Sequence, residues 1–146
     1  MNGLPEEDTD WIRGISIKQP WTTAILTGAK TVENRPRPWR TGWVLLHASQ
    51  QTDRSALRQP LVARTIRGRE LVTGAVLGVA RITDCHQDPH GSPPCTEWAL
   101  PEAWHLVLTD VHALPLPIPA RGQLGPWKPT PELLEQVLQQ LPELSS

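Results

Sequence analysis

The chain has 146 residues, of which 38% are hydrophobic and 20% charged, and its net charge at pH 7 is −1. This length suits one domain with a hydrophobic core and is too short for two domains of ordinary size. There is no apolar run near the roughly 20 residues of a membrane-spanning helix, no visible secretory signal and no disulfide framework from two cysteines, so we expect a cytoplasmic protein without a membrane partner.

Charge is distributed unevenly along the chain. Residues 11–81 carry twelve Lys and Arg against three acidic residues, a net charge of +9, whereas residues 82–146 carry −6. Such asymmetry points to contact with nucleic acid, although arginines on a solvated helix face would give the same pattern. The large aromatic residues are seven Trp, with no Phe and no Tyr. Indole must therefore fill the core, and it also offers a flat surface on which a base can stack.

The sequence predicts five short strands. The acidic residues 1–10 are expected to form a disordered tail, and residues 11–146 a single domain that ends in a helix. Apolar alternation and β-branched residues predict strands at 11–18, 31–35, 42–48, 74–83 and 104–114. Pro115, Pro117 and Pro119 are expected to end regular structure after the last strand, because proline cannot donate a ladder hydrogen bond.

Helices are expected between these strands and at the C-terminus. Pro20 suits the first position of a short helix, where its missing N–H has no intrahelical partner. A second helix is expected over residues 54–67, and Pro60 should interrupt or split it. Thr130 is expected to cap a last amphipathic helix at residues 131–141. Strands and helices this short favour an α+β fold, a small mixed-strand β-barrel flanked by short helices.

Residues 16–35, SIKQPWTTAILTGAKTVENR, hold most of the candidate chemistry of the chain. Lys30 and Glu33 lie three positions apart. In a partly dry cleft Lys30 could keep its charge and clamp a phosphate, or lose a proton and act as a base or nucleophile. A structural salt bridge between the two is the alternative. Lys18 and Gln19 precede an expected helix, where free backbone N–H groups favour an anion.

Basic residues alternate with an indole a few positions further on. Arg35, Arg37 and Arg40 flank Trp39. This arrangement suits a single-stranded nucleic acid, because guanidinium groups bind phosphate while indole stacks on a base. An exposed loop kept soluble by arginine is the alternative. Trp21 lies on the apolar stripe of the first helix, which favours a place in the core over a stacking role.

His47 and Ser49 fall two positions apart on a predicted strand, so they share one face of it. They either line the same cleft as Lys30 or face solvent. A serine hydrolase is disfavoured, because a nucleophilic Ser with a His needs a third group to orient the imidazole and none stands at a recognisable spacing.

The sequence gives little support for a metal or a cofactor. Cys85, His86, His90 and Cys95 could in principle supply zinc ligands. No paired CxxC motif supports such a site, and the prolines around these residues indicate a solvent-exposed loop, so we expect no metal. Glycine-rich phosphate-binding motifs are absent as well, so no nucleotide cofactor is expected.

Several of these motifs, taken in order, resemble the signature of ASCH domains, a branch of the PUA-like superfamily. The resemblance rests on the Gln-Pro-Trp turn at residues 19–21, the Gly-x-Lys-x-x-Glu-x-Arg element at residues 28–35 and the strand that ends in His-Ala-Ser at residues 47–49. The segments AWHLVLTDV and GQLGPWKP resemble the closing strand and the tail of such proteins, so the likeness covers roughly residues 14–129. It implies a PUA-like pseudo-barrel of five or six mixed strands, with a cleft between the barrel and its helices.

The resemblance also implies a function, the binding of single-stranded RNA or DNA or of a nucleotide-like ligand in that cleft. Some relatives resemble ribonucleases or a small amidohydrolase that deacetylates N4-acetylcytidine, so a hydrolase that uses Lys30 and Glu33 is the alternative. That amidohydrolase has Thr at the position of Glu33, which makes us favour binding over catalysis. A third, weaker possibility is a protein-interaction domain with a proline-rich rim at residues 115–129. The candidate binding residues are Lys18, Gln19, Trp21, Lys30, Glu33, Arg35, Trp39, Arg40, His47 and Ser49.

Overall fold

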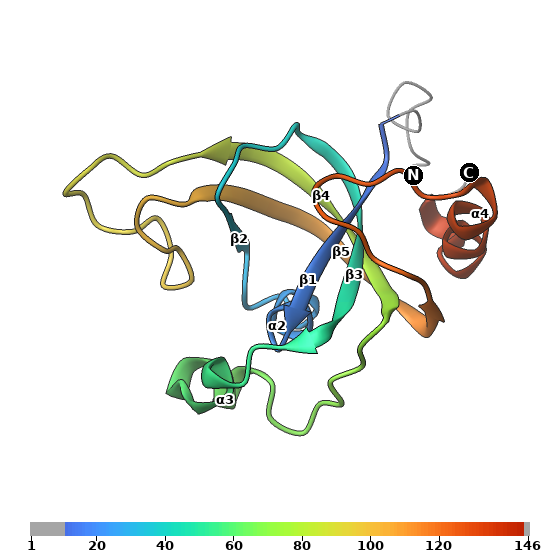
Figure 1. The fold of residues 1–146 in the computed structure, drawn as a ribbon, viewed down its shortest axis with the longest axis horizontal. Coiled ribbons are helices and arrows are strands. Elements are labelled where there is room, and N and C mark those ends of the chain that lie inside the picture. Colours follow the sequence, from blue (N-terminus) through green and yellow to red (C-terminus); the bar gives the residue numbers. More distant parts are fainter. Residues whose placement is uncertain (1–10, 145–146) are drawn as a thin grey trace.

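The computed structural model describes residues 11–144, so the tail expected at residues 1–10 lies outside the described residues. The elements in chain order (Figure 1) are β1 (Arg13–Gln19), α2 (Trp21–Leu26), β2 (Val32–Arg35), β3 (Gly42–Thr52), the 3₁₀ helix η1 (Ser55–Arg58), α3 (Pro60–Thr65), β4 (Ala75–His86), β5 (Trp104–Pro119), α4 (Pro131–Gln140) and the 3₁₀ helix η2 (Pro142–Leu144). No helix within this described range is long and apolar enough to cross a membrane.

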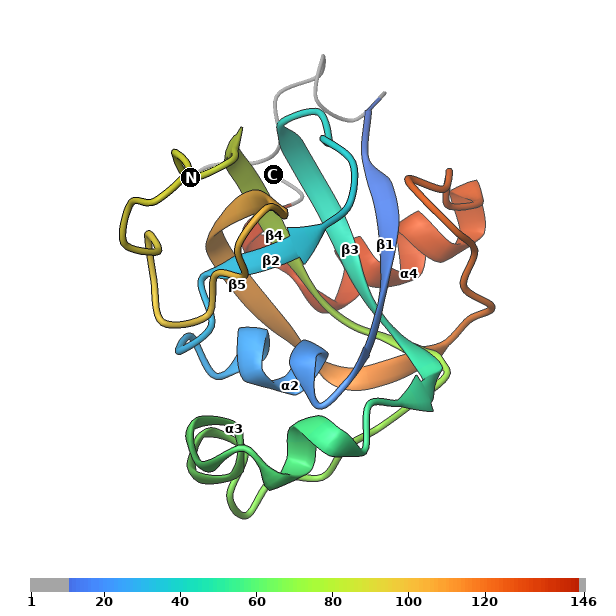
Figure 2. The same cartoon turned by 60° about the vertical axis from the view of Figure 1, so that its left-hand side comes forward.

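The five strands form one sheet in the order β1-β3-β4-β5-β2. β1 pairs with β3 in parallel, and every other neighbouring pair in this sheet is antiparallel. The strands twist and the long strand β5 bends, so the sheet curls into a half-barrel whose edges are β1 and β2 (Figure 2). The expected α+β barrel with short flanking helices is thereby confirmed.

Each face of the curled sheet packs against an apolar core. The inner core lies inside the half-barrel and includes Val44 and Leu46. The outer core lies between the sheet and α4, and it includes Trp43, Leu45 and Val137. Successive residues of β3 enter opposite cores because side chains alternate along a strand.

The helices lie on different sides of the sheet, with α2 across one end of the half-barrel, α3 beyond it and α4 behind the sheet (Figure 2). Ala24 of α2 and Val62 of α3 are buried together in a small apolar cluster. Pro60 stands at the start of α3, so it splits the helix expected over residues 54–67 into η1 and α3. The Thr130 hydroxyl accepts a hydrogen bond from the Leu133 N–H at 3.1 Å, which confirms the expected N-cap of α4.

Three strands extend several residues beyond their predicted ends. β3, predicted to end at residue 48, continues to Thr52. β4 continues to His86 and β5 to Pro119, so the expectation that three prolines end regular structure at this point is wrong. The register between β4 and β5 shifts so that residues 114–117 have no partner in β4. Pro115 and Pro117 fall in this bulge, where a missing N–H removes no ladder hydrogen bond, and Pro119 is the last residue of the strand.

Candidate functional site

The edge strands β1 and β2 lie at opposite ends of the sheet order and leave an opening that we call the seam. Glu33 on β2 is paired with Leu106 of the inner core, so its side chain points into the half-barrel. Arg35 lies two residues further and has the same orientation. Its Nη2 donates a hydrogen bond to the backbone carbonyl oxygen of Ser16 on β1 at 2.8 Å. A side chain of β2 therefore holds the two edges of the half-barrel together.

Three charged residues, Lys30, Glu33 and Arg35, form what we call the seam cluster. Lys30 Nζ donates to the carbonyl oxygen of Val32 and lies 3.3 Å from Glu33 Oε1. Glu33 Oε2 in turn lies 3.2 Å from Arg35 Nη2. Lys30 is only 2% exposed and Glu33 only 8%. Burial lowers the pKa of the Lys30 ammonium group, Glu33 partly offsets this effect, and the Arg35 charge adds to it.

The seam cluster can act chemically in two ways. A buried lysine whose pKa is lowered is a candidate base or nucleophile, because the neutral amine carries a free electron pair. The cluster can instead have a structural role and hold the half-barrel closed. The ion pair of Lys30 with Glu33 and the hydrogen bond of Arg35 to Ser16 are the contacts that would do so. Arg35 Nε is buried and has no hydrogen-bond partner among the described residues, so one donor of the cluster is unused.

Indole rings pack against both cations of the seam cluster. Lys30 Nζ lies 5.7 Å from the ring centroid of Trp21, and the Arg35 guanidinium lies 5.6 Å from that of Trp39. Trp39 belongs to the inner core and is 9% exposed, so almost none of its ring is available to a base. Trp21 is half-buried, and its ring packs edge-to-face on Trp98 with 6.5 Å between the centroids.

Gln19 has a structural role at the end of β1, where its side chain is fully buried. Its Nε2 donates to the carbonyl oxygen of Val72 at 2.8 Å, and its Oε1 accepts from the Thr23 N–H at 3.0 Å. These bonds connect the start of α2 to the segment that precedes β4. Both polar ends of the amide are therefore occupied within the protein.

A second polar region lies on the outer face of β1 and β3. The Trp127 indole N–H donates to Ser16 Oγ at 3.1 Å, and Ser16 Oγ lies 3.1 Å from His47 Nδ1. His47 Nε2 lies 2.7 Å from the carbonyl oxygen of Ala120, which can only accept. Nε2 therefore carries the proton and Nδ1 accepts from the Ser16 hydroxyl. This chain of hydrogen bonds fixes the returning segment 120–127 against the sheet.

The returning segment and the sheet border an open groove of about 790 Å³, which we call the outer groove. Its polar lining includes Ser16, His47, Ser49, Gln50, Arg121 and Gln123. Lys18 lies two residues beyond Ser16 on β1 and is exposed. A Cβ added at Gly122 would lie only 2.5 Å from the His47 ring, which explains a glycine at this close approach.

The structure divides the predicted site residues between two regions. Lys30, Glu33 and Arg35 come together at the seam, whereas His47 and Ser49 line the outer groove on the opposite face of the sheet. Arg40 belongs to neither region, and its exposed guanidinium stacks 4.5 Å from the ring centroid of Trp11.

Sequence reasoning missed the residues that complete the outer groove, Gln50, Arg121 and Gln123. Arg121 and Gln123 follow β5, more than 100 positions after β1, and no local pattern predicts that they return to it. The local signal in the segment GQLGPWKP is Gly122, where a glycine allows such a close approach.

Comparisons with known proteins agree on one family. The model of the ASCH domain family matches residues 15–117. The crystal structure of ASCH from Zymomonas mobilis is similar, with a TM-score of 0.53, 17% sequence identity, and coverage of 93% of this chain and 96% of that chain. At this level of identity the likeness concerns the fold. No curated protein matches the sequence.

Proposed function

Because this chain belongs to the ASCH domain family and has its PUA-like fold, we propose that it binds single-stranded RNA. The outer groove receives one nucleotide unit of the strand. The seam cluster keeps the half-barrel closed beside it. Trp39 and Gln19 are left out of the binding set, because their side chains are already committed to the core and to internal hydrogen bonds.

The polar outer groove, whose lining includes the exposed Arg121, is the observation that carries this proposal. Arg121 lines the groove, Lys18 is exposed two residues beyond the groove residue Ser16, and both cations are suited to phosphate oxygens. Gln50 and Gln123 offer both donors and acceptors to the edge of a base. Leu124 also lines the groove and is 100% exposed, so it gives a base an apolar surface to contact.

Fluorescence anisotropy with a labelled single-stranded RNA at low salt tests the proposal. Lys18→Ala and Arg121→Ala should each weaken binding several-fold, because each removes one phosphate contact. Arg81→Ala is the matched control, since Arg81 is exposed and pairs with Trp43 on a part of β4 outside the groove. It should bind RNA like the wild type.

Two results would overturn RNA binding in the outer groove. One is no binding of any RNA at low salt, and the other is groove variants that bind RNA as tightly as Arg81→Ala does. A single-stranded DNA of the same sequence should bind less tightly if the 2′-hydroxyl is read. Equal affinity for the RNA and the DNA would mean that the ligand is any single-stranded nucleic acid.

A hydrolase that uses the seam cluster is the second candidate function, and the buried Lys30 favours it. Burial lowers the pKa of this amine, which raises the fraction of its neutral, reactive form. Incubation with N4-acetylcytidine, and separately with labelled RNA, tests the candidate. Turnover by the wild type that disappears in Lys30→Met and Glu33→Gln, both shown by circular dichroism to be folded, supports a hydrolase. Absence of turnover in the wild type rejects it.

A further inference from the structure

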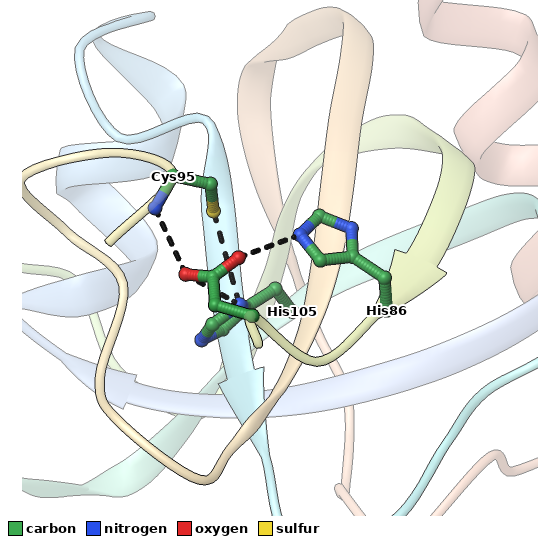
Figure 3. A group of neighbouring side chains, drawn as sticks. His86, Cys95 and His105 are labelled. Carbon is green, nitrogen blue, oxygen red and sulfur yellow. Dashed lines mark hydrogen bonds and ion pairs between the residues drawn. The ribbon is translucent and has the colours of Figure 1, made fainter. Parts of the chain in front are cut away.

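Four side chains of metal-ligating types converge where β4 ends and β5 begins (Figure 3). His86 is the last residue of β4, and His105 is its partner in the register with β5. Asp88 and Cys95 come from the loop of residues 87–103 between these strands. One potential ligand atom from each of the four lies within 4.8 Å of each of the others.

Some separations between these side chains are close to those around a tetrahedral metal ion. Asp88 Oδ1 lies 3.1 Å from His86 Nε2, and Asp88 Oδ2 lies 3.5 Å from His105 Nδ1. Cys95 Sγ lies 3.8 Å from the same His105 nitrogen. Around tetrahedral zinc, bond lengths of about 2.0–2.3 Å place neighbouring ligand atoms about 3.3–3.8 Å apart. The distances of Asp88 and Cys95 to His105 fall within this range, whereas the contact of Asp88 with His86 is shorter and uses the other carboxylate oxygen, so zinc would fit after these side chains shift.

Hydrogen bonds to the outer nitrogens of both histidines turn their inner nitrogens toward the cluster. His105 Nε2 lies 2.7 Å from the carbonyl oxygen of Leu100, which can only accept, so Nε2 carries a proton and Nδ1 is free to coordinate. His86 Nδ1 lies 2.6 Å from Asp84 Oδ2, which leaves Nε2 facing Asp88. An imidazole that donates its other N–H to a carbonyl or carboxylate is the usual arrangement of a metal ligand.

We propose that His86, Asp88, Cys95 and His105 bind one zinc ion. A thiolate and two imidazoles favour zinc or a similar transition metal over magnesium or calcium, which prefer oxygen. Four protein ligands complete a tetrahedral shell, so the site is structural and leaves no position open for substrate. The ion would fasten the loop of residues 87–103 to the ends of β4 and β5.

This site differs from the zinc set that the sequence suggests. The sequence suggests Cys85, His86, His90 and Cys95 as possible zinc ligands, and without a paired CxxC motif it predicts no metal there. Cys85 Sγ instead accepts a hydrogen bond from the Trp39 backbone N–H at 3.4 Å, and His90 is exposed outside the cluster. His105 lies ten positions beyond Cys95 on the next strand, and only strand pairing brings it to His86.

Metal titration of the full chain under reducing conditions tests the zinc site. After treatment with EDTA, the protein should bind one zinc ion per chain in competition with a chromophoric chelator. Cobalt added in place of zinc should give the visible bands of a tetrahedral ion and a thiolate-to-cobalt charge-transfer band. Zinc should also raise the midpoint of thermal unfolding, because an ion that binds only the folded state stabilises it.

Substitutions then identify the ligands. Cys95→Ser should abolish the charge-transfer band, and His86→Ala should weaken zinc binding at least about tenfold; both positions are partly exposed, so the fold should persist. Asp84→Asn should weaken binding about 10-fold to 100-fold, because it removes the partner that orients His86. Cys85→Ser and His90→Ala are the matched controls and should bind zinc like the wild type.

Two results would overturn the zinc site. The first is a wild-type chain that takes up no stoichiometric zinc or cobalt from the chelator. The second is a Cys95→Ser or His86→Ala variant with wild-type affinity and an unchanged cobalt spectrum.

Discussion

Ser16 takes part in both candidate regions through different atoms. Its backbone carbonyl accepts the hydrogen bond from Arg35 at the seam. Its hydroxyl stands between Trp127 and His47 at the outer groove. The identity of the side chain at position 16 therefore matters to the groove, whereas the backbone contact that closes the barrel is available to any residue.

Replacement of Ser16 by alanine should separate these two roles. Ser16→Ala leaves the Trp127 N–H and His47 Nδ1 without their partner, which should lower the free energy of unfolding by about 1–3 kcal/mol. RNA binding should weaken as well, because segment 120–127 loses its attachment to β1. Urea denaturation and anisotropy measure the two effects.

Ser49→Ala is the matched control for Ser16→Ala. Among residues 11–144, the Ser49 hydroxyl donates one hydrogen bond, to the nearby carbonyl oxygen of Gln51 at 3.3 Å. Its loss should change the free energy of unfolding by less than about 0.5 kcal/mol. Equal destabilisation by the two substitutions would contradict the role assigned to Ser16.

The buried Lys30 should make stability depend on pH in a defined direction. Burial lowers its pKa from the ordinary value of 10.5, while Glu33 and Arg35, which face it at the seam, act in opposite directions. The folded protein therefore binds this proton less tightly than the unfolded chain, and protonation opposes folding. The penalty is complete below the folded pKa and disappears as the pH rises to 10.5.

A comparison of wild type with Lys30→Met measures this dependence. As the pH rises through the alkaline range, the free energy of unfolding of the wild type should increase relative to that of the variant. Urea denaturation at a series of pH values gives the difference, with Lys18→Met as the control for loss of an exposed lysine. A wild-type minus variant difference that stays constant with pH would show that Lys30 titrates alike in both states.

At the scale of elements, α4 is attached to the sheet through the outer core. Val137 is fully buried there, whereas the neighbouring Gln136 is exposed. Val137→Ala should lower the free energy of unfolding by about 1–3 kcal/mol through lost burial and a cavity. Gln136→Ala, measured by the same thermal or urea denaturation, should have little effect. An unchanged stability of Val137→Ala would mean that the helix contributes little to the fold.

The local elements could be predicted because their signals are local. Pro60 divides a helix by its own geometry, and Thr130 caps one through its own hydroxyl. The length of β5 could not be predicted in this way. Its prolines are tolerated only because the register shift leaves residues 114–117 without ladder partners, and a register shift depends on two strands at once.

The same distinction between local and non-local signals applies to the candidate site residues. Lys30, Glu33 and Arg35 lie within six positions, so the sequence could predict that they meet. It could not predict that burial would leave Lys30 and Glu33 almost inaccessible. The outer groove joins residues from β1, β3 and the segment after β5, and the proposed zinc site joins two strands and a loop. Both depend on strand pairing, which residue spacing does not encode.

For the molecule as a whole, a net charge of −1 gives little long-range attraction for a polyanion. For the proposed RNA binding, attraction would therefore come from local cations such as Lys18 and Arg121. If the protein contacts two phosphates, the logarithm of the RNA association constant should fall linearly as the logarithm of the salt concentration rises. The expected slope is about −1.4. Anisotropy at a series of salt concentrations measures the slope.

The salt slope also measures how many phosphates of the strand the protein contacts. Arg121→Ala should reduce its magnitude by about half, since one of two contacts is lost. A slope several times steeper would instead mean that the strand follows the arginine-rich surface of residues 11–81. A slope of zero would exclude phosphate contacts altogether.

The prolines of β5 have a consequence beyond the single chain. β2 pairs with β5 at residues 104–107, and within the described part of the chain the later part of β5 has no strand partner on that side. An uncovered strand edge is where two protein molecules most readily add to each other's sheets and aggregate. Proline at alternate positions 115, 117 and 119 presents an incoming strand with no N–H groups at those points. These prolines should therefore protect the folded protein against edge-to-edge association at high concentration.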